Sequence, residues 1–270
     1  MADTNQSLER GLSILELLEA AGEPLGVREI ARRLDLSPTI VQRLVKTLED
    51  AQFVMKYADS RKYGLGYRAL SLGSSMLTDD SLVAAAMPVL ERLTREMEVN
   101  AFLSVISGKR LIYILAIQSN GPISIRSAPG TEAAFHSTAM GKAILAEESE
   151  ARARALLGPG PLASLTERTV LDPDAVIAEL ETVRRQGYAT SVEENLVGVS
   201  STGACVRNAS GRCIAAISIA YVPSLQPKIQ LAEAINKVTA SATEISRRLG
   251  CPEERLGEVQ TIEVVDNDVA

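Results

Sequence analysis

Two short stretches with helical apolar spacing, separated by a tight turn, constrain the fold of this chain more than any other feature. Apolar side chains recur every three or four positions over residues 27–34 and again over residues 40–48. Between them, Ser37 is suited to cap the second helix and Pro38 to occupy its first position, where a missing N–H has no effect. Two short helices joined by such a turn form a helix-turn-helix.

The segments on either side of these two helices fit the same unit. Residues 8–18 predict a preceding helix that buries a stripe of leucines at positions 8, 12, 15 and 18. Residues 53–65 read apolar–turn–apolar, which predicts a hairpin with Arg61 and Lys62 at its tip, and thus a basic wing. Charge is also uneven, because residues 1–35 hold four basic and seven acidic side chains while residues 36–68 hold six basic and three acidic.

Side chains predicted to point outward from the second helix have chemistry suited to DNA. Arginine can contact guanine through two hydrogen bonds, glutamine can pair with adenine, and lysine reaches phosphate. The alternative is a helical bundle with an ordinary polar surface. The candidate DNA-contacting residues are Arg28, Ser37, Pro38, Thr39, Gln42, Arg43, Lys46, Arg61 and Lys62.

A dinucleotide-binding fingerprint in the same region is rejected. Residues 64–69 match Gly-x-Gly-x-x-Ala. That motif requires a buried strand before it and an acidic residue about 20 positions later within a βαβ unit. Here an exposed basic hairpin precedes it.

The rest of the chain alternates helices and strands. Residues 67–80 predict a linker helix, and Ser81 is suited to cap a second helix that Pro88 should kink or break. Strands are expected at 101–106, 110–116, 123–128, 188–192, 202–206 and 213–220, and helices at 137–145, 150–157, 172–186 and 226–249. Hairpin connections between strands predict an α/β domain around a mainly antiparallel sheet.

Composition excludes several classes of protein. The chain has 270 residues, of which 46% are hydrophobic, and its formal charge is −6. No apolar run is long enough to span a bilayer and the first residues lack a secretory signal, so a cytoplasmic location is expected. One histidine and three cysteines without a Cys-x-x-Cys pair predict no zinc site and no other cofactor.

Three function classes stay open on these residues. The first is a ligand-responsive DNA-binding regulator. The second is an enzyme that turns over a small acid, which the single histidine and the missing nucleophile–base pair disfavour. The third is an interaction protein whose N-terminal unit binds another protein.

The order of several stretches resembles the IclR family of bacterial transcription regulators over nearly the whole chain. The N-terminal stretches that carry the resemblance are 7–15, 36–48 and 63–66. The C-terminal ones are 135–146, 187–189 with Glu193-Glu194, Gly198-Val199, and 215–218. The resemblance implies a non-enzymatic regulator, with repression of a catabolic operon as the commoner case.

Family architecture implies four parts of the chain. They are a winged helix-turn-helix domain (1–68), a linker helix (69–82), a GAF-like effector-binding and oligomerisation domain (83–252) and an acidic flexible tail (253–270). The resemblance also implies a homodimer or a dimer of dimers on double-stranded DNA with a pseudo-palindromic operator.

The resemblance further implies an effector site formed by Ala139, Met140, Ser191, Ser201, Ser218 and Ala220. Members that bind small keto acids resemble this chain but carry Asp, Cys and a second Ser where Ser191, Ser201 and Ala220 stand. A larger organic or aromatic acid is therefore expected, with its carboxylate held by N–H groups near Thr138.

Several of these residues also have a purely structural interpretation. His136 is expected to form a structural hydrogen bond, and Cys205 and Cys213 to fill the core. The three serines could instead satisfy backbone groups. The arginines at 152, 154, 184 and 185 are expected on solvated helix faces.

Overall fold

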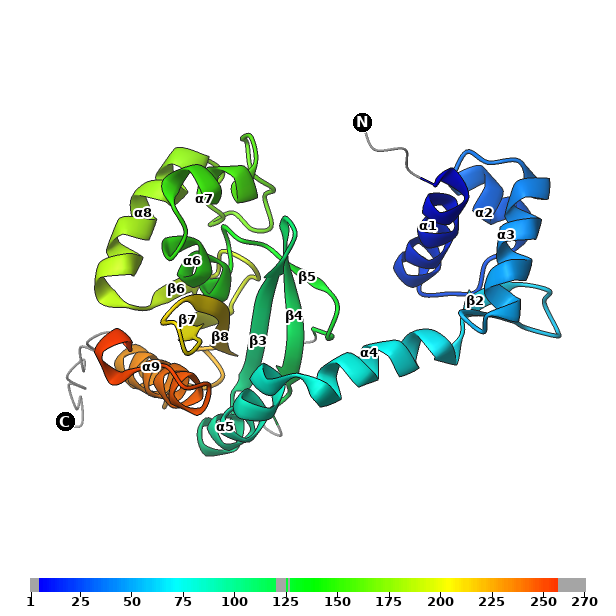
Figure 1. The fold of residues 1–270 in the computed structure, drawn as a ribbon. Coiled ribbons are helices and arrows are strands. Elements are labelled where there is room, and N and C mark those ends of the chain that lie inside the picture. Colours follow the sequence, from blue (N-terminus) through cyan, green and yellow to red (C-terminus); the bar gives the residue numbers. More distant parts are fainter. Residues whose placement is uncertain (1–4, 120–124, 126, 257–270) are drawn as a thin grey trace. The chain divides into compact units, whose positions relative to one another are not determined.

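The computed structural model describes residues 5–119, 125 and 127–256, apart from the side chains of 76–79. The chain divides into two compact units, residues 1–79 and 80–270 (Figure 1). Each unit has its own hydrophobic core. Among the described helices, none is long and apolar enough to cross a membrane.

The N-terminal unit is a winged helix-turn-helix. Its elements are α1 (Gln6–Ala21), α2 (Val27–Arg33), α3 (Pro38–Asp50), β1 (Val54–Lys56), β2 (Tyr63–Leu65) and α4 (Tyr67–Asp79). Strands β1 and β2 pair antiparallel, and Leu25 extends this small sheet through a bridge to Tyr63. Ser37 caps α3 as predicted, its hydroxyl accepting a hydrogen bond from the Ile40 amide at 3.3 Å.

The stripe of α1 that faces the core differs from the prediction. Ile14 and Leu18 are buried, whereas Leu8 and Leu12 are 62% and 51% exposed. Positions 11, 14 and 18 also follow helical spacing, and this second stripe is the one that faces the core, where α1 packs on α3 and β2. The prediction was wrong for the first two leucines.

The C-terminal unit is built on a six-stranded sheet in the order β5-β4-β3-β8-β7-β6, in which every pair of neighbours is antiparallel. The strands are β3 (Asn100–Ser107), β4 (Arg110–Ile117), β5 (Glu132–Ala133), β6 (Ala189–Val192), β7 (Ser200–Arg207) and β8 (Cys213–Tyr221). The predicted fold class, a winged helix-turn-helix followed by an α/β domain with an antiparallel sheet, is therefore confirmed.

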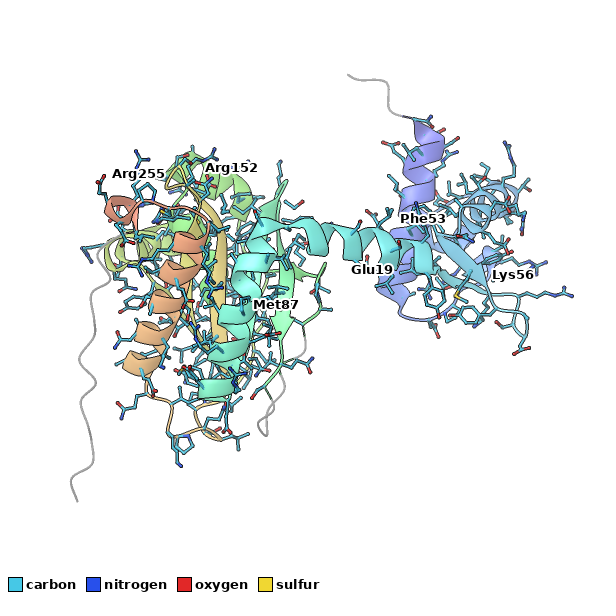
Figure 2. The ribbon with its side chains drawn as sticks, turned by 60° about the horizontal axis from the view of Figure 1, so that its bottom comes forward. Glu19, Phe53, Lys56, Met87, Arg152 and Arg255 are labelled. Atoms are coloured by element: carbon cyan, nitrogen blue, oxygen red, sulfur yellow. The ribbon has the colours of Figure 1, made fainter. Side chains whose placement is uncertain are left out.

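Helices cover both faces of this sheet. They are α5 (Ser81–Met97), α6 (Ala139–Ala146), α7 (Glu150–Leu157), α8 (Pro173–Gln186) and α9 (Leu231–Arg248), with a short 3-10 turn η1 (Glu253–Arg255). Helices α5 and α9 lie side by side on one face (Figures 1 and 2). Helix α6 packs on the other face and is in turn covered by α8, against which α7 packs.

Two helix predictions need correction. Helix α5 runs unbroken through Pro88. Pro88 has no N–H to donate to the Ala84 carbonyl, but both residues face solvent, where water can replace that hydrogen bond. The helix keeps its packing because Val89 and Leu90 remain buried. Helix α9 begins at Leu231 rather than at Gln226, since Pro227 disfavours a helical conformation at the residue before it.

Three further predictions differ in detail from the structure. Half of the strand predicted at 123–128 lies outside the described residues, and its described positions 125, 127 and 128 are not in a strand; the edge strand beside β4 is β5. Helix α6 begins at Ala139, two residues later than predicted, because Thr138 caps it and accepts a hydrogen bond from the Gly141 amide at 3.1 Å. Residues 253–255 of the predicted tail form η1, and residues 257–270 lie outside the description.

Candidate nucleic-acid interface and ligand cavity

Helix α3 presents the predicted polar row on its exposed side. Thr39, Gln42, Arg43 and Lys46 are all exposed, and their spacing places them on one face of the helix. The opposite face is fixed by the buried side chains of residues 41 and 45. Ser37 and Pro38 at the helix start and Arg28 on α2 are also exposed. A row of this chemistry on an amphipathic second helix is suited to the major groove of DNA.

Acidic neighbours already pair with some of the cations around this row. Lys46 Nζ lies 2.6 Å from Asp50 Oδ1, and this hydrogen bond raises the pKa of the Lys46 ammonium. On α2, Glu29 binds both Arg32 and Arg33, and their hydrogen bonds lower the pKa of the Glu29 carboxyl from 4.5 to about 2. Charge on this unit is therefore partly neutralised within the chain.

The wing carries exposed cations at its tip. Arg61 and Lys62 lie in the turn between β1 and β2, and Arg61 adopts a left-handed backbone with φ of 53°. The turn is closed by hydrogen bonds from the Arg61 amide to the Tyr57 carbonyl and from the Tyr57 amide to the Lys62 carbonyl. Lys56, which the sequence did not single out, lies 5.7 Å from the centre of the Tyr63 ring. Figure 2 labels it on this hairpin.

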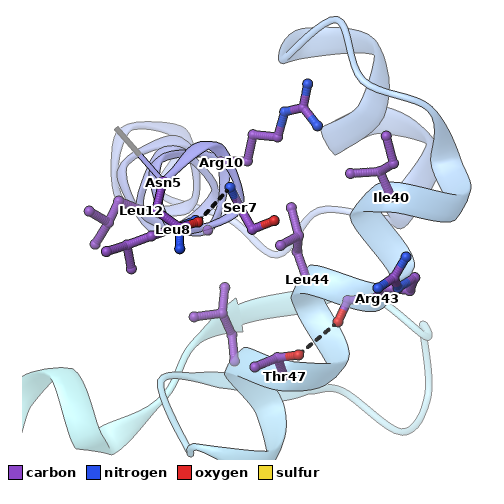
Figure 3. Close-up of a pocket in the computed structure, with 11 residues that line it drawn as sticks. Asn5, Ser7, Leu8, Arg10, Leu12, Ile40, Arg43, Leu44 and Thr47 are labelled. Atoms are coloured by element: carbon purple, nitrogen blue, oxygen red, sulfur yellow. Dashed lines mark hydrogen bonds between the residues drawn. The ribbon is translucent and has the colours of Figure 1, made fainter. Parts of the chain in front are cut away.

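A groove of about 580 Å³ separates α1 from α3 (Figure 3). Leu8 and Leu12 line it from α1, and Ile40 and Leu44 line it from α3. Arg43 belongs to the same lining, and its carbonyl accepts a hydrogen bond from the Thr47 hydroxyl at 3.1 Å. The two leucines that the helical core leaves exposed therefore border an apolar groove.

A cavity of about 250 Å³ in the C-terminal unit brings most of the predicted effector residues together. Its lining residues are Phe102, Tyr113, Ile125, Ser127, Thr138, Met140, Ser191, Asn195, Leu196, Val199, Ser201, Ser218 and Ala220. Sheet register explains this grouping, because Ser201 pairs with both Ser191 and Ala220, and directly paired residues share a face of the sheet.

Ala139 is the predicted effector residue that does not line this cavity. Its side chain is 1% exposed, and its backbone packs on Gly203 of β7. A β-carbon at position 203 would lie 2.8 Å from the carbonyl carbon of Ala139 and from the amide nitrogen of Met140. The glycine therefore lets the first turn of α6 sit directly on the sheet, where Met140 reaches the cavity.

The three predicted serines differ in their hydrogen bonds. Ser191 donates from its hydroxyl to the Ser137 carbonyl at 2.7 Å, so the structural interpretation holds for this residue. Within the described part of the chain, the hydroxyls of Ser201 and Ser218 have no hydrogen-bond partner, and both border the cavity. These two hydroxyls can donate to or accept from a ligand.

Sequence reasoning missed the aromatic wall of the cavity. The rings of Phe102 and Tyr113 meet edge to face, with centroids 5.5 Å apart and an interplanar angle of 62°. Burial raises the pKa of the Tyr113 phenol, and its hydrogen bond with Ser127 opposes that rise. Pairing Phe102 with Ser218 across β3 and β8 is the signal that could have placed this ring in the cavity, but that register is not evident from the strand patterns alone.

His136, the cysteines and Arg184 take structural roles. The His136 ring nitrogen Nε2 lies 2.9 Å from the Ala163 carbonyl oxygen. Cys205 donates from its thiol to the Ala143 carbonyl at 3.1 Å. Arg184 is exposed on α8 as predicted, and its Nε also donates to the Ala146 carbonyl at the end of α6 at 2.7 Å. Across the described part of the chain, no group of three or more His, Cys, Asp or Glu side chains could hold a metal ion.

Comparison with known proteins assigns both units to one protein family. Residues 74–247 match the family model described as bacterial transcriptional regulator IclR C-terminal, and residues 7–56 match that of the IclR helix-turn-helix domain. The regulator BhcR of Paracoccus denitrificans is 29% identical, over 89% of this chain and 86% of its own. The repressor AllR of Escherichia coli is 26% identical, over 91% and 90%.

Solved structures share the fold. An IclR regulator from Alicyclobacillus acidocaldarius superposes with a TM-score of 0.80 at 26% identity, covering 92% of this chain and 100% of the other. An IclR homologue from Microbacterium hydrocarbonoxydans, solved in complex with 4-hydroxybenzoate, gives 0.78 at 21% identity, over 90% of this chain and 99% of the other.

Proposed function

This chain belongs to the IclR family of bacterial transcriptional regulators, and we propose from that premise that it is an effector-responsive repressor of a catabolic operon. Family members, among them the relatives named above, are transcriptional regulators rather than enzymes. The observation that carries the proposal is the combination of two features, an exposed Thr–Gln–Arg–Lys row on α3 and a cavity in a separate compact unit. Its site of action is the chromosome, in the cytoplasm.

DNA contact is assigned to α3, the start of that helix, and the wing. Gln42 and Arg43 are positioned to read base edges, and Arg61 and Lys62 to hold phosphates. Thr39 and Lys46 complete the row on α3, Ser37 and Pro38 lie at the start of the helix, and Arg28 adds a cation from α2.

One such helix reads too few base pairs to be specific in a genome, so we infer a homodimer, or a dimer of dimers, on a pseudo-palindromic operator. The exposed Leu8 and Leu12 beside the groove between α1 and α3 supply an apolar surface for a second copy. Sedimentation of the Leu12→Lys variant should then show a weakened dimer.

The effector is assigned to the cavity. About 250 Å³ with an aromatic wall and two hydroxyls suits a small organic or aromatic acid. Its carboxylate is placed at the start of α6, where the amide groups and the helix dipole favour an anion, with Ala139 supplying backbone there. The 4-hydroxybenzoate complex of the Microbacterium relative supports this ligand class. The AllR relative is described as a transcriptional repressor, which supports the proposal that this chain represses its target genes.

Footprinting of the full chain on DNA flanking its own gene tests this proposal. We expect two symmetric protected patches, lost when a small acid such as 4-hydroxybenzoate is added, and weakening of the complex as salt rises. A single short asymmetric footprint, or binding without sequence preference, would reject the operator model. An unchanged footprint across a panel of aromatic and aliphatic acids would reject the effector model alone.

A further inference from the structure

A buried ammonium group lies on the helix that carries the cavity-lining Met140. The Lys142 side chain, on α6, is 2% exposed. Its Nζ lies 2.9 Å from Glu179 Oε1 on α8, and 2.8 Å and 2.7 Å from Oε1 and Oε2 of Glu194. Removing such charges from water is costly, and replacing a buried ion pair by apolar residues is often neutral or stabilising. Fold stability alone therefore does not account for this cluster.

Glu194 belongs to a loop that forms one side of the cavity. The loop spans residues 193–199 between β6 and β7, and its Asn195, Leu196 and Val199 line the cavity. The middle of the loop is weakly buried, since Leu196 is 50% and Val197 71% exposed. The Glu193 amide donates to the Val199 carbonyl at 2.8 Å and joins the two ends of the loop, so anchors at its first residues also hold its last one.

Several anchors hold this end of the loop. The hydroxyls of Thr166 and Thr169 donate to the carbonyls of Glu193 and Glu194, at 2.6 Å and 2.7 Å. Ser137 donates to the side-chain oxygen of Asn195 at 3.0 Å. The ion pair of Lys142 with Glu194 differs from these, because it is charge-assisted and ties the loop to the body of α6.

Lys142 therefore connects the two walls of the cavity. Met140, two residues earlier on α6, lines one wall, and the loop that Glu194 anchors lines the other. We propose that Lys142 is a positioning residue that holds the loop 193–199 against α6 as a closed wall and so slows escape of the bound acid. The second part of this inference rests on the proposed effector function.

Glu179 provides the matched control. It contacts the same ammonium group from α8 but contributes nothing to the lining of the cavity. Glu194→Gln keeps the shape of the side chain and removes the charge that ties the loop, while Lys142 retains Glu179. Glu179→Gln leaves the tie to the loop in place. Burial raises the pKa of the Glu194 carboxyl, and its contact with Lys142 opposes that rise.

Hydrogen–deuterium exchange on the full-length protein decides the first part. In Glu194→Gln, amides of residues 193–199 should exchange about tenfold faster, as expected from the loss of one hydrogen bond to a charged group. Exchange there should be unchanged in Glu179→Gln, and amides of α9 should be unchanged in both, which shows that the fold is intact. Unaltered exchange in Glu194→Gln, or equal loosening in both variants, would overturn the proposal.

Ligand dissociation tests the consequence, with 4-hydroxybenzoate and benzoate as probes. Both should leave Glu194→Gln about tenfold faster than wild type and leave Glu179→Gln at the wild-type rate. A loosened loop with unchanged dissociation would overturn the link to ligand escape. If wild type binds neither probe, the aromatic-acid assignment fails, while the exchange result still decides the role of Lys142.

Discussion

A β-carbon on Gly66 would lie 2.2 Å from the carbonyl oxygen of Gln52. The chain leaves the wing at this point and passes directly over the backbone that follows α3, where the Gly66 amide donates to the Phe53 carbonyl at 2.8 Å. This close approach, rather than a phosphate-binding turn, explains why a glycine ends the Gly-x-Gly sequence.

Substituting Gly66 by alanine should therefore destabilise the N-terminal unit. The backbone must move to relieve the overlap, and overpacking of this kind costs about 1–3 kcal/mol. Chemical denaturation of the two variants Gly66→Ala and Gly73→Ala tests this. Gly73 lies on α4 with nothing within 4 Å of its missing β-carbon, so its substitution should leave stability unchanged or raised. Equal effects of the two substitutions would contradict the packing account.

Arg43 and Lys62 should affect DNA binding differently. Arg43 lies on the exposed row of α3, so Arg43→Ala should weaken operator binding by about 1–3 kcal/mol and relax specificity at one position. Lys62 lies at the wing tip, so Lys62→Ala should weaken operator and random DNA alike. Gel shifts on both DNAs give the comparison. Intact operator affinity in Arg43→Ala would show that α3 is not the reading helix.

Acid should remove the stabilising effect of Glu29. Hydrogen bonds from Arg32 and Arg33 lower the pKa of this carboxyl from 4.5 to about 2, so its folded form prefers the charged state. The stabilisation is fully present above about pH 4.5 and is lost as the pH falls through about 2. The difference in melting temperature between wild type and Glu29→Gln should be constant near neutrality and vanish in strong acid. An ordinary Glu29 pKa in an NMR titration would refute this.

Ser201 and Ser218 should govern the effector response without affecting DNA binding. Their hydroxyls border the cavity and have no partner in the described chain, so Ser201→Ala and Ser218→Ala remove donors without adding volume. Each should weaken binding of an acid effector about tenfold, the value of a hydrogen bond to a charged group. Ser191→Ala serves as a control that disturbs structure, since that hydroxyl is held by Ser137. A double Ser201, Ser218 variant that loses operator binding but titrates the effector normally would contradict the assignment.

Local sequence signals correctly predicted features that depend on neighbouring residues, such as the ends of helices. Ser37 and Pro38 started α3 as expected, and Gly187 ended α8 in the left-handed conformation typical of helix ends. Which of the two apolar stripes of α1 is buried does not depend on neighbouring residues alone. Leu12 and Ile14 are both large and apolar, and only the packing of α1 against α3 and β2 determines which of them is buried.

The site was less predictable than the fold for a similar reason. Lys142 is bound by Glu179 and Glu194, which lie 37 and 52 residues further along the chain. Tyr113 and Asn195 reach the cavity from a strand and a loop far apart in sequence. No spacing rule connects such residues, so the family resemblance located part of the cavity while the aromatic wall and the buried lysine required the structure.

The ion pairs within the N-terminal unit also affect how strongly the affinity for DNA depends on ionic strength. Arg32, Arg33 and Lys46 are bound to carboxylates of the same chain. A side chain already neutralised in this way displaces few condensed counterions when it approaches a phosphate, and each phosphate that a protein neutralises on duplex DNA contributes about −0.9 to the slope of log affinity against log salt. Fewer released ions leave non-specific sites poorly populated, so the regulator would spend less time on the bulk of the chromosome and more on its operator.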